Sequence, residues 1–236
     1  MILSLHVPKA AGNSFRALLE TEFGERLMPD YGDWAGFNVP EAIERCNIRA
    51  LSMRNRRDEL LEKYDAIHGH FVADKYVGLF PQAAFVAFVR DPYQQAASHY
   101  CFLLRNPQRD HPEEKMFHDA RMTLHDYLSW DAFRNHQSQY LGSLSICDLA
   151  MVGLSEEFYK SVDLFNSLFG RNLRGDSFLN VNPDHQGEPY RISEDIRKAV
   201  EKYRPADIEL YRRAKEIFAR QIAKAGSQNK AAASGR

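Results

Sequence analysis

The chain has 236 residues, of which 44% are hydrophobic, and this is enough for one sizeable core but leaves little room for a second. With 31 Lys and Arg against 32 Asp and Glu the net charge is −1, so the composition excludes a general attraction to nucleic acid or to an anionic membrane. We therefore predict a single domain over residues 1–225, a disordered Ala-, Ser- and Gly-rich tail over residues 226–236, and an anion site, if any, that is local.

The cysteines and the apolar segments restrict the class of protein further. Cys46, Cys101 and Cys147 lie far apart and form no CxxC pair, so neither a zinc site nor a disulfide framework is indicated. No stretch reaches the roughly 18 apolar residues that a membrane span needs, and no signal-peptide pattern precedes the first strand. These features predict a cytoplasmic protein.

The first predicted element is a short apolar strand over residues 2–7, followed by a small-residue loop and then a helix. Such a loop presents backbone N–H groups and a helix N-terminus to an anion, and Lys9 adds a mobile positive charge. The ATP-binding pattern GxxxxGK[ST] places its lysine after the second glycine, whereas Lys9 precedes Gly12. The alternative is an ordinary strand–helix turn with a solvated lysine.

Two more strands end in polar residues. Residues 65–68 form a short strand near His68 and His70, and the continuous apolar run over residues 84–89 suits a central parallel strand that ends at Arg90. An arginine is poorly placed at the end of a buried strand unless it meets an anion or an acid. Ser98, two helical turns later, offers a hydroxyl to the same anion; an ion pair with the neighbouring acid is the alternative interpretation.

The remaining pattern completes an alternating order. We predict a strand over residues 149–154, a helix over 156–169, a further strand over 177–181, and helices over 193–203 and 206–224. Strands that alternate with helices predict an α/β fold, here a P-loop-type parallel β-sheet of about five strands flanked by helices on both faces. Ligands of such sheets bind at the carboxyl ends of the strands, where the polar residues above are expected to meet.

Three motifs in this order resemble those of the PAPS-dependent sulfotransferases, where PAPS is 3′-phosphoadenosine 5′-phosphosulfate. The run HVPKAAGNS over residues 6–14 is similar to the HxPKTAGTS loop for the 5′-phosphosulfate, and FVRDPYQQAAS over 88–98 to the RDP…S motif for the 3′-phosphate. IHGH over 67–70 resembles the HGH element of the heparan sulfate and uronyl 2-O-sulfotransferase branch. Weaker similarities follow at 135–142, 152–156 and 207–211, so the resemblance spans nearly the whole chain.

The resemblance implies that PAPS is the donor, that PAP (adenosine 3′,5′-bisphosphate) is the product and that no metal is required. Ala10 and Asn13 stand where the family has threonines, so this loop has one hydroxyl fewer at position 10 and a different donor at position 13. The donor-binding residues would be Lys9, Ala10, Ala11, Gly12, Asn13, Ser14, Arg90 and Ser98.

The histidines supply the candidate base. A histidine with a near-neutral pKa is a suitable base for an acceptor hydroxyl, and the resemblance favours His70, with His68 as the other candidate and Lys9 as the group that meets charge on the leaving oxygen. A histidine that only binds backbone is the alternative, and a zinc pair is also conceivable, although no third ligand is visible nearby.

The resemblance implies an acceptor with a hydroxyl group, either a carbohydrate or a small metabolite, and nothing in the pattern indicates nucleic acid or fixes the oligomeric state. A basic run before the second strand is compatible with an anionic sugar chain or, alternatively, with a solvated helix face: Arg49, Arg54, Arg56 and Arg57. Two rival functions remain open. One is a P-loop-type nucleotide kinase, and the other is a non-catalytic nucleotide-binding scaffold protein.

Overall fold

A computed structural model describes residues 1–33, 40–106, 112–174 and 188–234 of the chain, and the structural statements below concern these residues. Five parallel strands form one sheet in the order β2-β3-β1-β4-β5. A helix follows each of β1, β3, β4 and β5 in the chain, so the predicted α/β fold with a parallel sheet is confirmed. The strands are β1 (Ile2–Leu5), β2 (Leu27–Pro29), β3 (Ala66–Gly69), β4 (Ala84–Val89) and β5 (Met151–Leu154).

The sheet is buried on both faces, as parallel sheets generally are, and its strands are accordingly mostly apolar, with Ser4 of β1 and His68 of β3 as buried polar exceptions. In the register, Leu5 of β1 pairs with Gly69 of β3 on one side and with Ala87 of β4 on the other. The residues that follow β1, β3 and β4 therefore come out at the same edge of the sheet.

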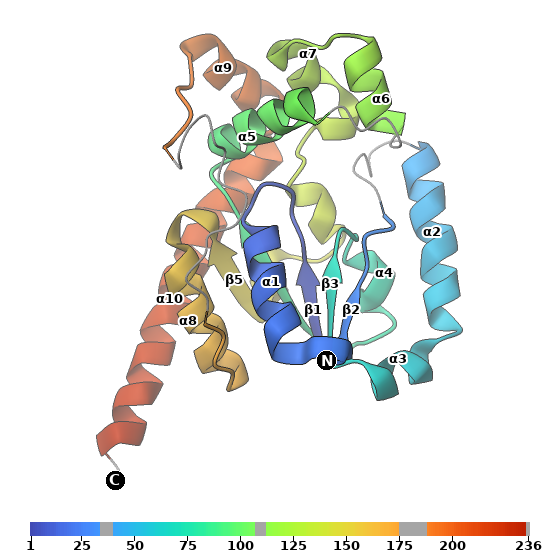
Figure 1. Ribbon diagram of the computed structural model, residues 1–236. Helices are drawn as coiled ribbons and strands as arrows, with labels where there is room; N and C mark the ends of the chain where they lie inside the picture. The colour runs from blue at the N-terminus through green and yellow to red at the C-terminus, as the bar shows by residue number, and fades with distance from the viewer. Residues whose placement is uncertain (34–39, 107–111, 175–187, 235–236) are drawn as a thin grey trace.

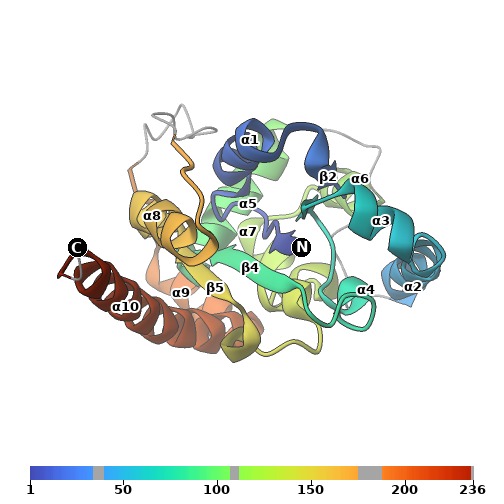
Figure 2. The ribbon, with the colours of Figure 1, turned by 90° about the horizontal axis from the view of Figure 1, so that it is seen from below.

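Helices cover both faces of the sheet (Figures 1 and 2). α1 (Gly12–Phe23) and α8 (Phe158–Phe169) lie on one face, and α4 (Asp74–Val77) and α10 (Pro205–Ser234) lie on the other. The Phe15 ring of α1 packs 4.7 Å from the Phe88 ring of β4 and 5.2 Å from the Phe165 ring of α8, centroid to centroid. Aromatic packing of this kind joins the sheet to the two helices above it.

A further group of helices, here called the cap helices, lies beyond the carboxyl ends of the strands (Figure 1). They are α5 (Pro92–Arg105), α6 (Pro112–Asp119), α7 (Leu124–Ser129) and α9 (Glu194–Tyr203). They share a second hydrophobic cluster, separate from that of the sheet, in which Leu103, Phe117, Tyr127 and Val200 are buried. The candidate site thus has the sheet edge below it and the cap helices above.

Other short elements complete the described chain. α2 (Pro40–Arg54) and α3 (Arg57–Lys63) lie at one side, next to the strand β2 (Figure 1). Short 3₁₀ turns occupy Gly24–Arg26, Asp131–Phe133, Ser138–Leu141, Ile146–Asp148 and Ser155–Glu157. None of the helices in the described ranges is both long enough and apolar enough to cross a lipid bilayer.

The structure differs from the sequence prediction at two places. β2 and α2 fall in a region that the sequence pattern leaves irregular, because a three-residue edge strand and a charged helix carry little periodic signal. α10 continues to Ser234, beyond residue 224, because the Ala, Gln and Lys of this segment favour helix. The strand predicted over residues 177–181 lies outside the described residues. The single domain and the disordered tail stay predictions.

Candidate functional site

The loop between β1 and α1 contains two non-glycine residues in the left-handed backbone region. Lys9 and Ala11 both have positive φ, 63° and 67°, although neither is glycine. Each such residue costs about 1 kcal/mol, and turns in which successive backbone N–H groups converge form anion-binding concavities. Ala11 is the N-cap of α1 and provides no side-chain cap, so the first N–H groups of the helix remain suited to an anion.

The residues of this loop are exposed to different degrees. Ala10 and Gly12 are buried, Ser14 is 2% exposed, and Asn13 is exposed to solvent. A Cβ atom added at Gly12 would lie 1.9 Å from the His6 ring, so only glycine allows the loop to pack on this histidine. The tight packing below the loop explains the glycine that the sequence motif contains.

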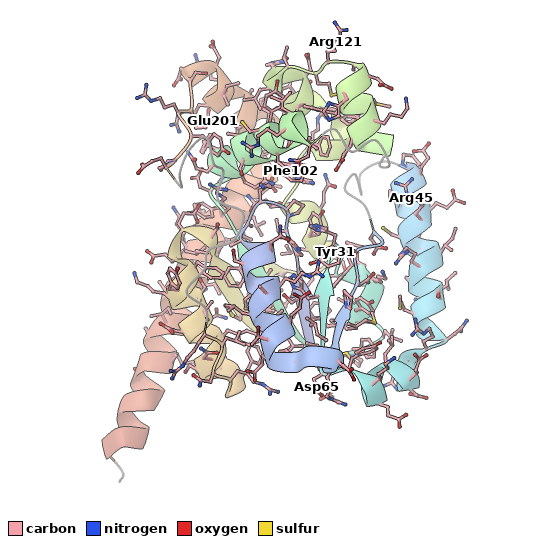
Figure 3. All side chains as sticks on the ribbon, viewed as in Figure 1. Tyr31, Arg45, Asp65, Phe102, Arg121 and Glu201 are labelled. Atoms are coloured by element: carbon pink, nitrogen blue, oxygen red, sulfur yellow. The ribbon has the colours of Figure 1, made fainter. Side chains whose placement is uncertain are left out.

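Within the described parts of the chain, no acidic side chain forms an ion pair with Lys9. Its Nζ lies 4.5 Å from the centre of the Phe102 ring of α5, which faces the loop from the cap (Figure 3). Burial, and then repulsion by Arg90 and Arg105, lower the pKa of Lys9 to about 8. Lys9 is thus a partly desolvated cation beside two other cations. An anionic ligand bound here would reduce the repulsion among them.

The Arg90 turn touches the Lys9 loop directly. The Arg90 guanidinium donates a hydrogen bond of 3.2 Å to the Lys9 carbonyl, and burial lowers the Arg90 pKa from its ordinary value. Asp91 caps α5 by accepting from the backbone N–H groups of Tyr93 and Gln94, both at 3.0 Å. Asp91 therefore serves the helix, and no ion pair between it and Arg90 is found among the described residues.

Ser98 lies on α5 and is 5% exposed, on the same helix as Phe102. The Lys9 loop and the Arg90 turn are adjacent at the carboxyl edge of the sheet, because β1 and β4 are paired neighbours. The structure brings together Lys9, Ala10, Ala11, Gly12, Asn13 and Ser14 with Arg90 in this way.

His70 follows β3 at the same edge and is half-buried. Its Nδ1 lies 2.7 Å from the carbonyl oxygen of His6, which only a protonated Nδ1 satisfies. In the neutral ring this bond leaves the lone pair on Nε2, which is the arrangement that a general base needs. The His70 ring lies 4.2 Å from the His6 ring, which in turn packs against Gly12 of the loop.

His68 has a different environment from His70. It lies within β3, is 2% exposed, and its Nδ1 lies 2.8 Å from the Ser4 hydroxyl of the neighbouring strand. Burial, and then the charge of His70, lower its pKa to about 3. The ring belongs to the interior of the sheet, where it supports His6 through a stacked contact of 5.1 Å.

Several side chains that the motifs do not single out complete the site. Tyr31, just after β2, bonds His6 through its hydroxyl at 2.9 Å and packs edge-on against His70 at 5.0 Å (Figure 3). Gln95 and Gln137, both fully buried, bond the backbone of the two loops. Their only sequence signal is their position: Gln95 lies inside the RDP…S motif, and Gln137 lies inside the weaker similarity at 135–142.

Two further expectations concern metals and the basic run. In the parts of the chain that the structure describes, no group of three or more His, Cys, Asp or Glu side chains is placed to hold a metal ion. Within the basic run, Arg49 pairs with Asp33 at 2.9 Å, Arg56 with Glu59 at 2.7 Å and Arg57 with Asp58 at 2.8 Å. These pairs favour the interpretation as an internally neutralised surface over that of a polyanion site.

Comparison with known proteins adds one finding. No protein-family model and no curated protein matches the chain. Among solved structures, a crystal structure of a sulfotransferase from Alicyclobacillus acidocaldarius is similar to 92% of this chain and 95% of its own, with 15% sequence identity and a TM-score of 0.49. The function of the chain therefore has to be argued from its own residues.

Proposed function

We propose that this protein is a sulfotransferase that moves a sulfuryl group from PAPS to an acceptor hydroxyl. The observation that carries the proposal is the contact between the two anion-binding elements: the Arg90 guanidinium donates to the Lys9 carbonyl, beside a histidine whose tautomer suits a base. A donor with phosphate at both the 3′ and the 5′ positions of one adenosine fits two such elements side by side.

The roles on the donor follow from the charges. Lys9 and the first N–H groups of α1 meet the 5′-phosphosulfate, and Arg90 with Ser98 meets the 3′-phosphate. Burial lowers the Lys9 pKa most, and repulsion by Arg90 and Arg105 lowers it further; binding of the anion relieves this repulsion. The same cations supply a positive field at the leaving oxygen, so the mechanism assigns no step to a metal.

The transfer itself is an in-line displacement at sulfur. The acceptor oxygen forms a bond to sulfur while its proton passes to Nε2 of His70. The bond between sulfur and the bridging oxygen breaks, its electron pair stays on the phosphate, and PAP leaves with charge that Lys9 stabilises. His70 is the proposed base rather than His68, because the His68 ring is enclosed in the sheet and hydrogen-bonded to Ser4.

For the acceptor, the proposal names a class of compounds and not a single compound. A hydroxyl of a carbohydrate or of a small metabolite is compatible with a His base. The pairing of the basic run, described above, weakens the argument for a long polyanionic chain at that surface.

Calorimetric titration with PAP, in the absence of metal, tests the donor directly. We expect PAP to bind more tightly than adenosine 5′-monophosphate or ATP, and Arg90→Ala to remove most of the preference for PAP over adenosine 5′-monophosphate. Arg213→Ala, at an exposed arginine of α10, is the matched control and should bind as the wild type does. Preference for ATP with magnesium would indicate the kinase instead, and the absence of all binding would refute the donor assignment.

Turnover separates an enzyme from a scaffold. With PAPS and a panel of phenolic and sugar acceptors, His70→Ala should lower kcat about 100-fold or more while PAP affinity stays within about twofold. Equal turnover in the wild type and in His70→Ala would remove this residue from the mechanism. PAP binding without any turnover in the wild type would favour the scaffold.

A further inference from the structure

Gln95 connects the Lys9 loop to the protein interior. Its side-chain amide donates a 2.9 Å hydrogen bond to the Pro8 carbonyl, and its oxygen accepts a 2.6 Å bond from the Arg204 guanidinium. The Pro8 carbonyl belongs to the same trans peptide unit as the Lys9 N–H, so the two point in opposite directions. The bond from Gln95 therefore fixes the direction of the Lys9 N–H at the very residue whose φ is strained.

Gln137 connects the Arg90 turn to the protein interior and fixes the direction of its peptide groups. Its side-chain oxygen accepts from the Arg90 N–H at 2.9 Å, and its side-chain nitrogen donates to the Arg90 carbonyl at 2.8 Å. Both backbone groups of Arg90 are thus held by one amide, while its guanidinium bonds the Lys9 carbonyl. The Gln137 backbone N–H is itself bound to the Asp207 carboxylate at 3.2 Å.

Arg204 and Asp207 come from one short segment, where α9 ends and α10 begins, and both are fully buried. Arg204 also donates to the Tyr127 hydroxyl at 2.8 Å, and Asp207 also accepts from the backbone N–H of Ser138 at 2.8 Å. Hydrogen bonds to several different elements hold these two buried charges, so we take this junction as the anchor of the site. One glutamine leads from it to each anion-binding element.

We propose that Gln95 and Gln137 are positioning residues that hold the Lys9 loop and the Arg90 turn at the separation set by the buried Arg204 and Asp207. This inference rests on the proposed function, because the separation matters for a ligand with two phosphate groups. Without the two amides, each element is free to rotate its peptide groups away from the anion, and binding then has to pay for reordering them.

The two glutamines have different predicted signatures in ligand binding. Gln95→Glu keeps the acceptor for Arg204 but loses the donor to the Pro8 carbonyl, so affinity for PAP and for adenosine 5′-monophosphate should fall together, about tenfold. Gln137→Met loses both bonds to Arg90, so affinity should fall about tenfold for PAP and stay within about twofold for adenosine 5′-monophosphate. A change in stability alone produces no such split.

Gln139 provides the matched control. This buried glutamine also donates to backbone carbonyls, those of Ala132 and Arg134, but the structure shows no bond from it to either anion-binding element. Gln139→Glu and Gln139→Met should leave both affinities within about twofold of the wild type. Thermal unfolding of all variants reports whether each has folded, and Gln95→Met and Gln137→Glu replace any variant that has not.

The outcomes distinguish this inference from the proposed function. If the wild type binds PAP and the Gln95 and Gln137 variants bind it equally well, the positioning role is refuted while the donor assignment stands. If the Gln139 variants lose as much affinity, the effect is general and the positioning role is also refuted. If the wild type itself does not bind PAP, the proposed function fails first. Hydrogen exchange in the ligand-free protein then still tests the anchor, since Gln95→Glu should speed exchange at residues 9–14 and Gln139→Glu should not.

Discussion

Lys9 should destabilise the ligand-free protein, and Lys9→Met should make it more stable. The folded state lowers the Lys9 pKa from 10.5 to about 8, chiefly through burial and then through Arg90 and Arg105. Each pH unit of that depression corresponds to about 1.4 kcal/mol, so the charged lysine costs about 3 kcal/mol at pH 7 before screening. Screening by water and the contact with the Phe102 ring reduce the cost to about 1–2 kcal/mol.

The pH dependence gives the sign of the effect. A lysine with a lowered folded pKa binds fewer protons in the folded state than in the unfolded state between about pH 8 and pH 10.5, so wild-type stability rises across this window. Lys9→Met has no such rise. Its advantage should be greatest at pH 7, where we expect a melting temperature higher by about 3–6 °C, and should shrink to less than half at pH 10.

Thermal or urea unfolding at pH 7 and pH 10 measures both quantities. Lys75→Met is the control with the opposite sign, because the buried Lys75 ammonium bonds the Asp30 carboxylate at 2.6 Å and the Asp33 carboxylate at 3.1 Å. Removing it leaves Arg49 as the cation that pairs with these buried carboxylates and takes away the shorter bond to Asp30, which should cost about 3 kcal/mol. A loss of stability in Lys9→Met at pH 7, or a gain that is the same at pH 10, would refute the reasoning.

Three other predictions follow from individual contacts. PAP affinity should decline as pH rises through about 8, because Lys9 then loses its proton. Calorimetry between pH 7 and pH 9.5 measures this, and an affinity that does not change with pH would mean that Lys9 does not bind PAP. Gly69→Ala should cost several kcal/mol in urea unfolding, because the new Cβ would lie 1.7 Å from the Asp30 backbone oxygen; Gly78→Ala, with open space around it, should be close to neutral. Arg204→Met should cost about 3 kcal/mol in the same assay, since it leaves the buried Asp207 carboxylate without its nearby cation; a change below about 1 kcal/mol would mean that this charge is dispensable.

Much of the site was predictable because its signals are local. The strand, the loop with Lys9 and Gly12 and the following helix are contiguous in the sequence, and so are the strand that ends at Arg90 and the helix that carries Ser98. A parallel sheet brings such strand ends to one edge whatever the details of packing. This is why the α/β fold and the neighbourhood of the two loops could be stated from the sequence.

The histidines show where local reasoning stops. His68 and His70 are two residues apart and chemically equal in the sequence, so the pattern left both as candidate bases. The tertiary structure separates them: β1 pairs with β3 and encloses His68 against Ser4, while the chain leaves the sheet before His70. Burial is a property of the neighbours in space, and no spacing along the chain encodes it.

By itself, the sequence determined the alternation of strands and helices and the two loops that carry Lys9 and Arg90. Only the tertiary structure decided how those loops are held, because Arg204 and Asp207 lie more than a hundred residues along the chain from them. Hydrogen bonds of this kind depend on distances of about 3 Å between atoms that the folded core brings together. Such contacts appear only when the packing of every intervening element is known.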